Sequence, residues 1–177
     1  INYGAIGVVI GHEITHGFDD RGSQYDKTGL LRNWWAQEDL AKFNEKRQCL
    51  VDQYGSFRDN AVAMNVSGIN TQGENVADNG GLKESFRAYK KLVALKGEGQ
   101  PLPGLGLTHD QLFFLSYAQM WCDKSTKLRT IQTLANGKHP PGRYRTIGAV
   151  QNSREFAEAF KCPIGSPMNP SKKCGVW

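Results

Sequence analysis

A run of five residues near the start of the chain has the types and spacing needed to hold a metal ion. The run reads HEITH, with His12 and His16 four positions apart and Glu13 between them. On a helix the two imidazoles project from one face, one turn apart, and can bind one Zn2+ at about 2 Å each. Glu13 lies roughly 100° around that helix from His12, where it can reach a metal-bound water without being a ligand. The alternative is an ordinary helix whose two histidines are satisfied by hydrogen bonds.

A catalytic zinc site needs a third protein ligand and an open position for water. The segment ENVAD is the best source, because Glu74 and Asp78 lie four positions apart and share a helix face. One carboxylate can bind the metal while the other holds the second nitrogen of a zinc-binding imidazole. Alternatively, both simply decorate a helix N-terminus, where the macrodipole favours acids. Asp19 can orient His16 in the same way, or lie with Asp20 in the loop that ends the helix.

These side chains must be positioned by a chain whose pattern is mainly helical. Apolar periodicity and capping residues predict helices over 3–17, 36–54, 74–95, 112–122, 127–135 and 152–160. Residues 143–150 are predicted as a strand or an extended segment, residues 55–73 as extended or looped, and residues 162–177 as irregular. Gly80 and Gly81 conflict locally with a helix over 74–95, because glycine disfavours helix interiors.

Composition limits the class of protein. The chain has 177 residues, 39% hydrophobic and 22% charged, which is typical of one globular domain spanning 1–177. Its net charge of +5 comes from scattered basic residues interleaved with acids, so we expect no nucleic-acid partner. No apolar run approaches the ~20 residues of a bilayer span. Because residue 1 is Ile and no signal-peptide pattern follows, we expect the chain to begin inside a longer protein.

The four cysteines form no CxxC pair, which argues against a cysteine zinc site. Their wide spacing fits either secreted disulfides or buried thiols. The sequon that begins at Asn65 favours a secreted, glycosylated protein.

Longer motifs surround the candidate metal ligands. They are HEITHGFDD (12–20), NWW (33–35), GENVADNGG (73–81), HPPG (139–142), QNS (151–153) and CGVW (174–177). In this order, and from end to end of the chain, they resemble the neprilysin/endothelin-converting enzyme family of zinc metallopeptidases. The resemblance implies a mainly α, thermolysin-like (gluzincin) catalytic subdomain with little strand. It also implies that the chain is the C-terminal part of a larger ectodomain whose N-terminal portion is missing.

The resemblance also implies a role for each candidate residue. His12, His16 and Glu74 would bind one Zn2+ per chain, and Asp78 and Asp19 would orient the zinc histidines.

Catalytic roles are implied for Glu13 as the base, for Asp78, and for His139, which would stabilise the transition state. Arg145 would bind a main-chain carbonyl or terminal carboxylate of the substrate, as a planar guanidinium can. Taken alone, His139 beside two prolines would be an exposed loop histidine.

The function implied is a zinc metalloendopeptidase that cleaves oligopeptides on the amino side of hydrophobic residues, by Glu13-assisted attack of a zinc-bound water. The alternatives are a catalytically inactive relative that binds peptide or zinc, and a helical interaction domain without metal.

The resemblance further implies a disulfide between Cys49 and Cys174, and partners for Cys122 and Cys162 in the missing N-terminal part. It places the protein on the extracellular face of the plasma membrane, through a single-pass type II anchor upstream, or outside the cell as a secreted protein.

Overall fold

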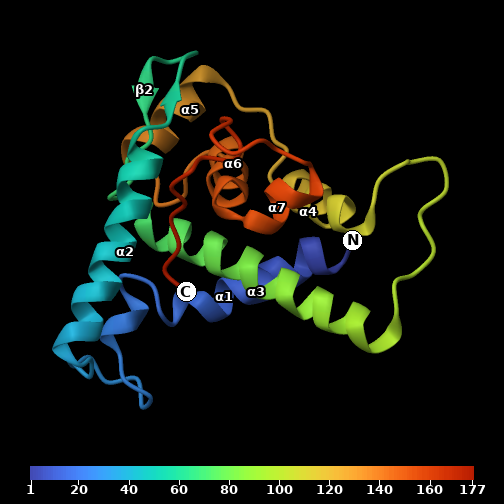
Figure 1. The fold of residues 1–177 in the computed structure, drawn as a ribbon. Helices are drawn as coiled ribbons and strands as arrows, with labels where there is room; N and C mark the ends of the chain where they lie inside the picture. Colours follow the sequence, from blue (N-terminus) through green and yellow to red (C-terminus); the bar gives the residue numbers. More distant parts are fainter.

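Helices form nearly all of the regular structure in the computed structural model, which describes residues 1–177 (Figure 1). The elements are η1 (Tyr3–Gly7), α1 (Val8–His16), η2 (Gly22–Gln24), α2 (Gln37–Gly55), β1 (Arg58–Asp59), β2 (Met64–Asn65), α3 (Gln72–Lys96), α4 (His109–Met120), α5 (Lys127–Asn136), α6 (Gly142–Asn152) and α7 (Arg154–Ala159). The elements η1 and η2 are a π-helix and a 3-10 helix. The predicted mainly α fold is confirmed, and no helix is both long and apolar enough to cross a membrane.

The helices α1 and α3 lie against each other at very short range (Figure 1). A Cβ added at Gly11 would stand 2.9 Å from the Cα of Gly81, and one at Gly81 would stand 2.6 Å from the backbone nitrogen of His12. Any side chain at these positions would push the two helices apart. The glycines that conflict with helix propensity in α3 are therefore what lets α1 approach it.

Two apolar clusters lie on either side of α3. The first joins α2, the β1–β2 hairpin and the C-terminal tail, and contains Phe43, Leu50, Tyr54, Val66, Val76, Leu134, Tyr144, Cys174 and Val176. The second joins α1, α3, α4 and α6, and contains Val8, Leu82, Phe86, Phe113, Phe114, Tyr117, Ala149 and Val150. A disulfide between Cys49 of α2 and Cys174 attaches the tail to the first cluster. Burial on two faces holds α3 in the middle of the molecule.

The prediction of a strand or extended segment at residues 143–150 is wrong. These residues form most of α6, which follows Pro141 and buries Tyr144, Arg145 and Ala149. The β-branched residues of this segment favour a strand. The segment nevertheless forms a helix, because in that conformation it packs against both apolar clusters. Residues 55–73 are predicted to be extended or looped, and they contain the antiparallel β1–β2 pair between turns.

Candidate metal centre

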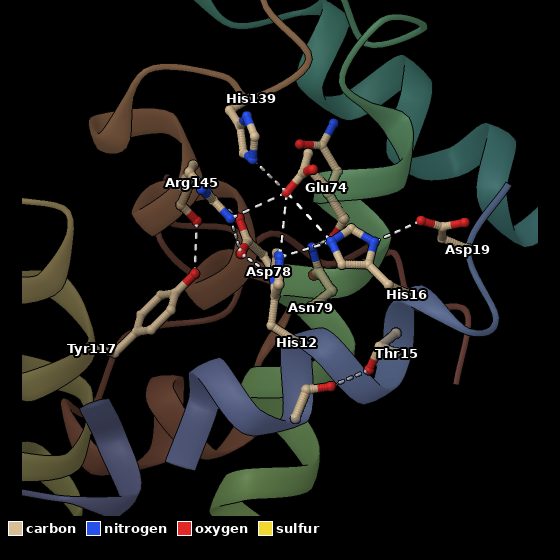
Figure 2. A network of polar contacts seen from close by, with 12 residues as sticks. His12, Thr15, His16, Asp19, Glu74, Asp78, Asn79, Tyr117, His139 and Arg145 are labelled. Carbon is tan, nitrogen blue, oxygen red and sulfur yellow. Dashed lines mark hydrogen bonds and ion pairs between the residues drawn. The ribbon is translucent and has the colours of Figure 1, made fainter. Parts of the chain in front are cut away.

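His12 and His16 project from α1 toward α3, and a carboxylate holds the Nδ1 atom of each ring (Figure 2). His12 Nδ1 donates to Oδ1 of Asp78 at 2.9 Å, and His16 Nδ1 donates to Oδ2 of Asp19 at 2.7 Å. A carboxylate can only accept, so each Nδ1 carries the proton and each neutral ring keeps its lone pair on Nε2. The two Nε2 atoms lie 3.0 Å apart. Two lone pairs facing each other at this distance require a cation or a proton between them.

Glu74 of α3 completes the group. Its Oε2 atom lies 3.3 Å from His12 Nε2 and 3.7 Å from His16 Nε2. That oxygen is buried and makes no hydrogen bond. The three candidate ligand atoms lie within 4.8 Å of one another. Two imidazole nitrogens and one carboxylate oxygen, on a site with an open side, are the donor set of catalytic zinc. The residues therefore fit a zinc ion.

The pKa values of His12 and Glu74 also indicate that the group favours a bound positive charge. Burial lowers the pKa of His12, but its hydrogen bond to Asp78 and its contact with the Glu74 carboxylate outweigh this effect and raise that pKa to about 9. Burial raises the pKa of Glu74, but the contact with His12 and the positive charges of His139, His16 and Arg145 outweigh this effect, so the pKa is lowered overall. Without a metal, a proton on His12 partly takes the place of the cation.

Asp78 joins the metal group to Arg145 of α6. Its Oδ1 accepts from His12 and also from Nη2 of Arg145 at 2.7 Å, and its Oδ2 accepts from Nε at 2.7 Å. Asp78 is fully buried, and Arg145 is 7% exposed. The guanidinium carbon lies 3.7 Å from the centre of the Trp121 ring, and the Tyr117 hydroxyl donates to the Arg145 carbonyl at 3.1 Å. The Nη1 atom takes no part in these bonds and is the one free for a further acceptor.

His139 lies at the open side of the site. His139 comes from the loop between α5 and α6, and its side chain is 59% exposed. Its Nε2 lies 3.0 Å from Oε2 of Glu74. Glu13 is exposed and has no ion pair, so its carboxylate is free. A cavity of about 410 Å³ lies between α3, the junction of α6 and α7, and the C-terminal tail, whereas one of about 380 Å³ borders His139 and Arg145 directly. We associate the second cavity with the metal group because it adjoins these side chains.

Seven residues that the sequence singles out thus meet at one place: His12, His16, Asp19, Glu74, Asp78, His139 and Arg145. Two supporting residues were missed, because Tyr117 and Trp121 belong to an apolar helical segment that predicts only core. An aromatic ring over an arginine is a contact that sequence spacing does not show.

The remaining predicted residues lie away from the metal group. Cys49 and Cys174 form the disulfide that the resemblance implies. Cys122 is exposed and Cys162 is half-buried, and both are free. Asn65 lies exposed in β2, where its amide donates to the Gly55 carbonyl at 3.0 Å.

A helical fold with HExxH on one helix and a glutamate ligand on a second defines the gluzincin type of metallopeptidase catalytic fragment. Residues 1–176 match the sequence model described as peptidase family M13, and the chain belongs to that family.

Relatives of known sequence and structure agree with this assignment. The chain is 52% identical to neprilysin of Oryctolagus cuniculus and 51% identical to endothelin-converting enzyme 1 of Bos taurus, over its whole length in both cases. It spans 24% and 23% of these relatives. Among solved structures, the inhibitor complex of the Mycobacterium tuberculosis zinc metalloprotease Zmp1 matches 99% of the chain and is itself covered to 27%, with a TM-score of 0.91 and 36% identity. The chain thus corresponds to about a quarter of each of these proteins.

Proposed function

We propose that the protein containing this chain is a zinc-dependent metalloendopeptidase that hydrolyses peptide bonds in oligopeptides. The observation that carries the proposal is the buried Oε2 of Glu74, which faces the Nε2 atoms of His12, His16 and His139 at 3.3, 3.7 and 3.0 Å without a hydrogen bond of good geometry to any of them. His12, His16 and Glu74 would hold one Zn2+ per chain. Membership of family M13 supports the same activity.

The chain's own residues would transfer protons and orient the zinc ligands. When bound, zinc supplies a Lewis acid that activates water and polarises the scissile carbonyl. Glu13 is adjacent to His12, exposed and unpaired, so its carboxylate can take a proton from the attacking water and pass it to the leaving amine. Asp78 and Asp19 keep the proton on Nδ1 of the two histidines, which leaves each Nε2 available as a ligand.

Two further side chains are placed to contact the substrate. His139 lies on the open side and can donate a hydrogen bond to the oxyanion that forms at the carbonyl. Arg145 can bind a substrate carbonyl or carboxylate through Nη1, since Asp78 occupies Nε and Nη2. Cleavage on the amino side of a hydrophobic residue is the part of the proposal that rests on the family resemblance alone, since the adjoining cavity has a mostly polar lining in which Met120 and Trp121 are apolar.

We also propose that the protein of which this chain is one part is extracellular. The disulfide between Cys49 and Cys174 is typical of oxidising compartments. Cys122 and Cys162 would pair with cysteines elsewhere in the polypeptide, and Asn65 would carry a glycan. An anchor outside these residues would hold the protein at the extracellular face of the plasma membrane, or the protein would be secreted.

The substitution Glu13→Gln in the full-length protein tests the catalytic assignment. We expect zinc content to be unchanged and cleavage of a fluorogenic oligopeptide to fall by orders of magnitude, since the amide cannot accept the proton. Near-normal cleavage would remove Glu13 as the base. As the matched control for the metal, Glu74→Val should lose zinc on dialysis, and retention of zinc would remove Glu74 as a ligand.

A further inference from the structure

The helix α3 carries a second pair of polar residues that the proposed mechanism does not use. Glu74 and Asp78 are four residues apart and face the histidines of α1. Asn75 and Asn79 repeat this spacing one position later, roughly 100° around the helix. Asn75 has no exposed surface. Its Nδ2 donates to Oγ1 of Thr71 at 2.9 Å, while its Oδ1 makes no hydrogen bond. Asn79 is half-buried, and the partners of its amide show what this face of α3 contacts.

The amide of Asn79 ties this face to two other helices. Its Nδ2 donates to the hydroxyl of Tyr54 in α2 at 3.2 Å and to the Asn75 carbonyl at 2.8 Å. Its Oδ1 accepts from Nδ2 of Asn152, the last residue of α6, at 2.8 Å. Asn79 follows Asp78 directly, so the tie lies one residue from the carboxylate that holds His12.

Asn152 is the point at which four segments meet. Besides Asn79, its Nδ2 donates to Oε1 of Gln53 in α2 at 2.9 Å. Its Oδ1 accepts from the backbone N–H of Cys174 at 2.9 Å. Cys174 is in turn attached to α2 by the disulfide to Cys49. Both donors and the acceptor of the Asn152 amide are thus hydrogen-bonded, so this one side chain links α6 to α3, α2 and the C-terminal tail.

Rotation of α3 about its axis would break the bonds on both faces at once. The bonds of Asp78 to His12 and Arg145 are 2.9, 2.7 and 2.7 Å long, and hydrogen bonds weaken steeply beyond about 3.2 Å. A helical turn moves as a rigid unit, so a shift at Asn79 is transmitted to Asp78 and Glu74. We propose that Asn79 and Asn152 are positioning residues that set the rotation of α3 and thereby hold Glu74 and Asp78 against the zinc histidines. This inference rests on the proposed zinc site, because it concerns the geometry of that site.

The test is the zinc dissociation constant of full-length Asn152→Ala, measured by chelator competition well below its melting temperature. Asn152 touches neither a ligand nor Asp78, yet we expect zinc binding to weaken by about 10-fold, the lower end of the range for indirect partners of a metal site. At saturating zinc, kcat should fall while KM stays near its wild-type value.

Two variants separate positioning from mere stabilisation. Thr108→Ala removes the capping box at the start of α4 and should lower the melting temperature without changing zinc affinity. Asn152→Asp keeps the acceptor for Cys174 and loses the donors to Asn79 and Gln53, so it should resemble Asn152→Ala if the bonds to α3 and α2 are what matters. Should Asn152→Ala not fold, Gln53→Ala removes only one of its acceptors and should weaken zinc binding in the same direction.

Wild-type zinc affinity and kcat in folded Asn152→Ala or Asn152→Asp would overturn the inference and leave the peptidase assignment intact. Wild-type protein that binds zinc without cleaving peptides would overturn the peptidase assignment, while the zinc measurements would still decide the role of Asn152. If the wild-type protein bound no zinc, both would fall.

Discussion

The most informative single change is Asp78→Asn, because it removes one charge and almost no volume. Asp78 accepts three short hydrogen bonds, one from His12 and two from Arg145, and has no exposed surface. In the variant, the amide of the new side chain has one acceptor oxygen. Its NH2 group replaces the other oxygen and cannot accept from His12 or Arg145. At least one bond is lost, and the buried guanidinium of Arg145 loses its counter-ion.

The expected magnitude follows from those contacts. Removing one partner of a buried ion pair costs about 3–5 kcal/mol of folding free energy. Removing the carboxylate that orients a metal-binding histidine lowers metal affinity by about 10–100-fold. We therefore expect Asp78→Asn to show both losses, measured by denaturant unfolding of the zinc-free protein and by zinc titration.

The matched control is Asp110→Asn. Its carboxylate accepts from Lys90 at 3.0 Å on the surface, where an ion pair contributes about 1 kcal/mol or less. An Asp78→Asn variant within about 1 kcal/mol of wild type, with unchanged zinc affinity, would refute the view that Asp78 joins the metal group to Arg145.

Three further outcomes follow from the same geometry. The folded-state pKa of His12 is raised from 6.5 to about 9, so its protonation stabilises the zinc-free protein fully below pH 6.5 and is lost as pH rises through 9. The unfolding free energy of the zinc-free protein should therefore fall between pH 6 and 10. Zinc affinity should rise over the same interval, because the proton on His12 competes with the metal, and an affinity that did not change with pH would contradict this prediction. Free zinc at 1,000 times its dissociation constant should stabilise the fold by about 4 kcal/mol, and a chelator should lower the melting temperature accordingly. Gly81→Ala places a Cβ 2.6 Å from the backbone nitrogen of His12 and should destabilise the protein by about 1–3 kcal/mol, whereas Gly55→Ala meets nothing within 4 Å and should be tolerated.

Much of the metal group follows from local spacing. His12 and His16 share a helix face because they lie one turn apart, and the same holds for Glu74 and Asp78. Periodicity also gave most helices to within a few residues, such as α2 at Gln37–Gly55 against a predicted 36–54. Spacing within one element is sufficient for such predictions because helix geometry is regular.

The family resemblance named residues that spacing alone would not have selected. His139 beside two prolines predicts an exposed loop, and its side chain is indeed 59% exposed. Only the path of the loop between α5 and α6 brings its ring to 3.0 Å from Glu74. Arg145 was expected in a strand or extended segment, and instead it is on α6, where its guanidinium reaches Asp78.

The sequence by itself determined the ligand types, their pairing along α1 and α3, and the helical character of the chain, because these depend on residues within a turn of one another. Tertiary structure alone decided that Asp78 serves both His12 and Arg145, which are 66 and 67 positions away from it. It also decided that glycines of α1 and α3 meet, and that Asn152 ties α3 to the tail. Such contacts depend on how helices distant in sequence pack, and the packing is the sum of many burial and hydrogen-bonding energies that no single motif contains.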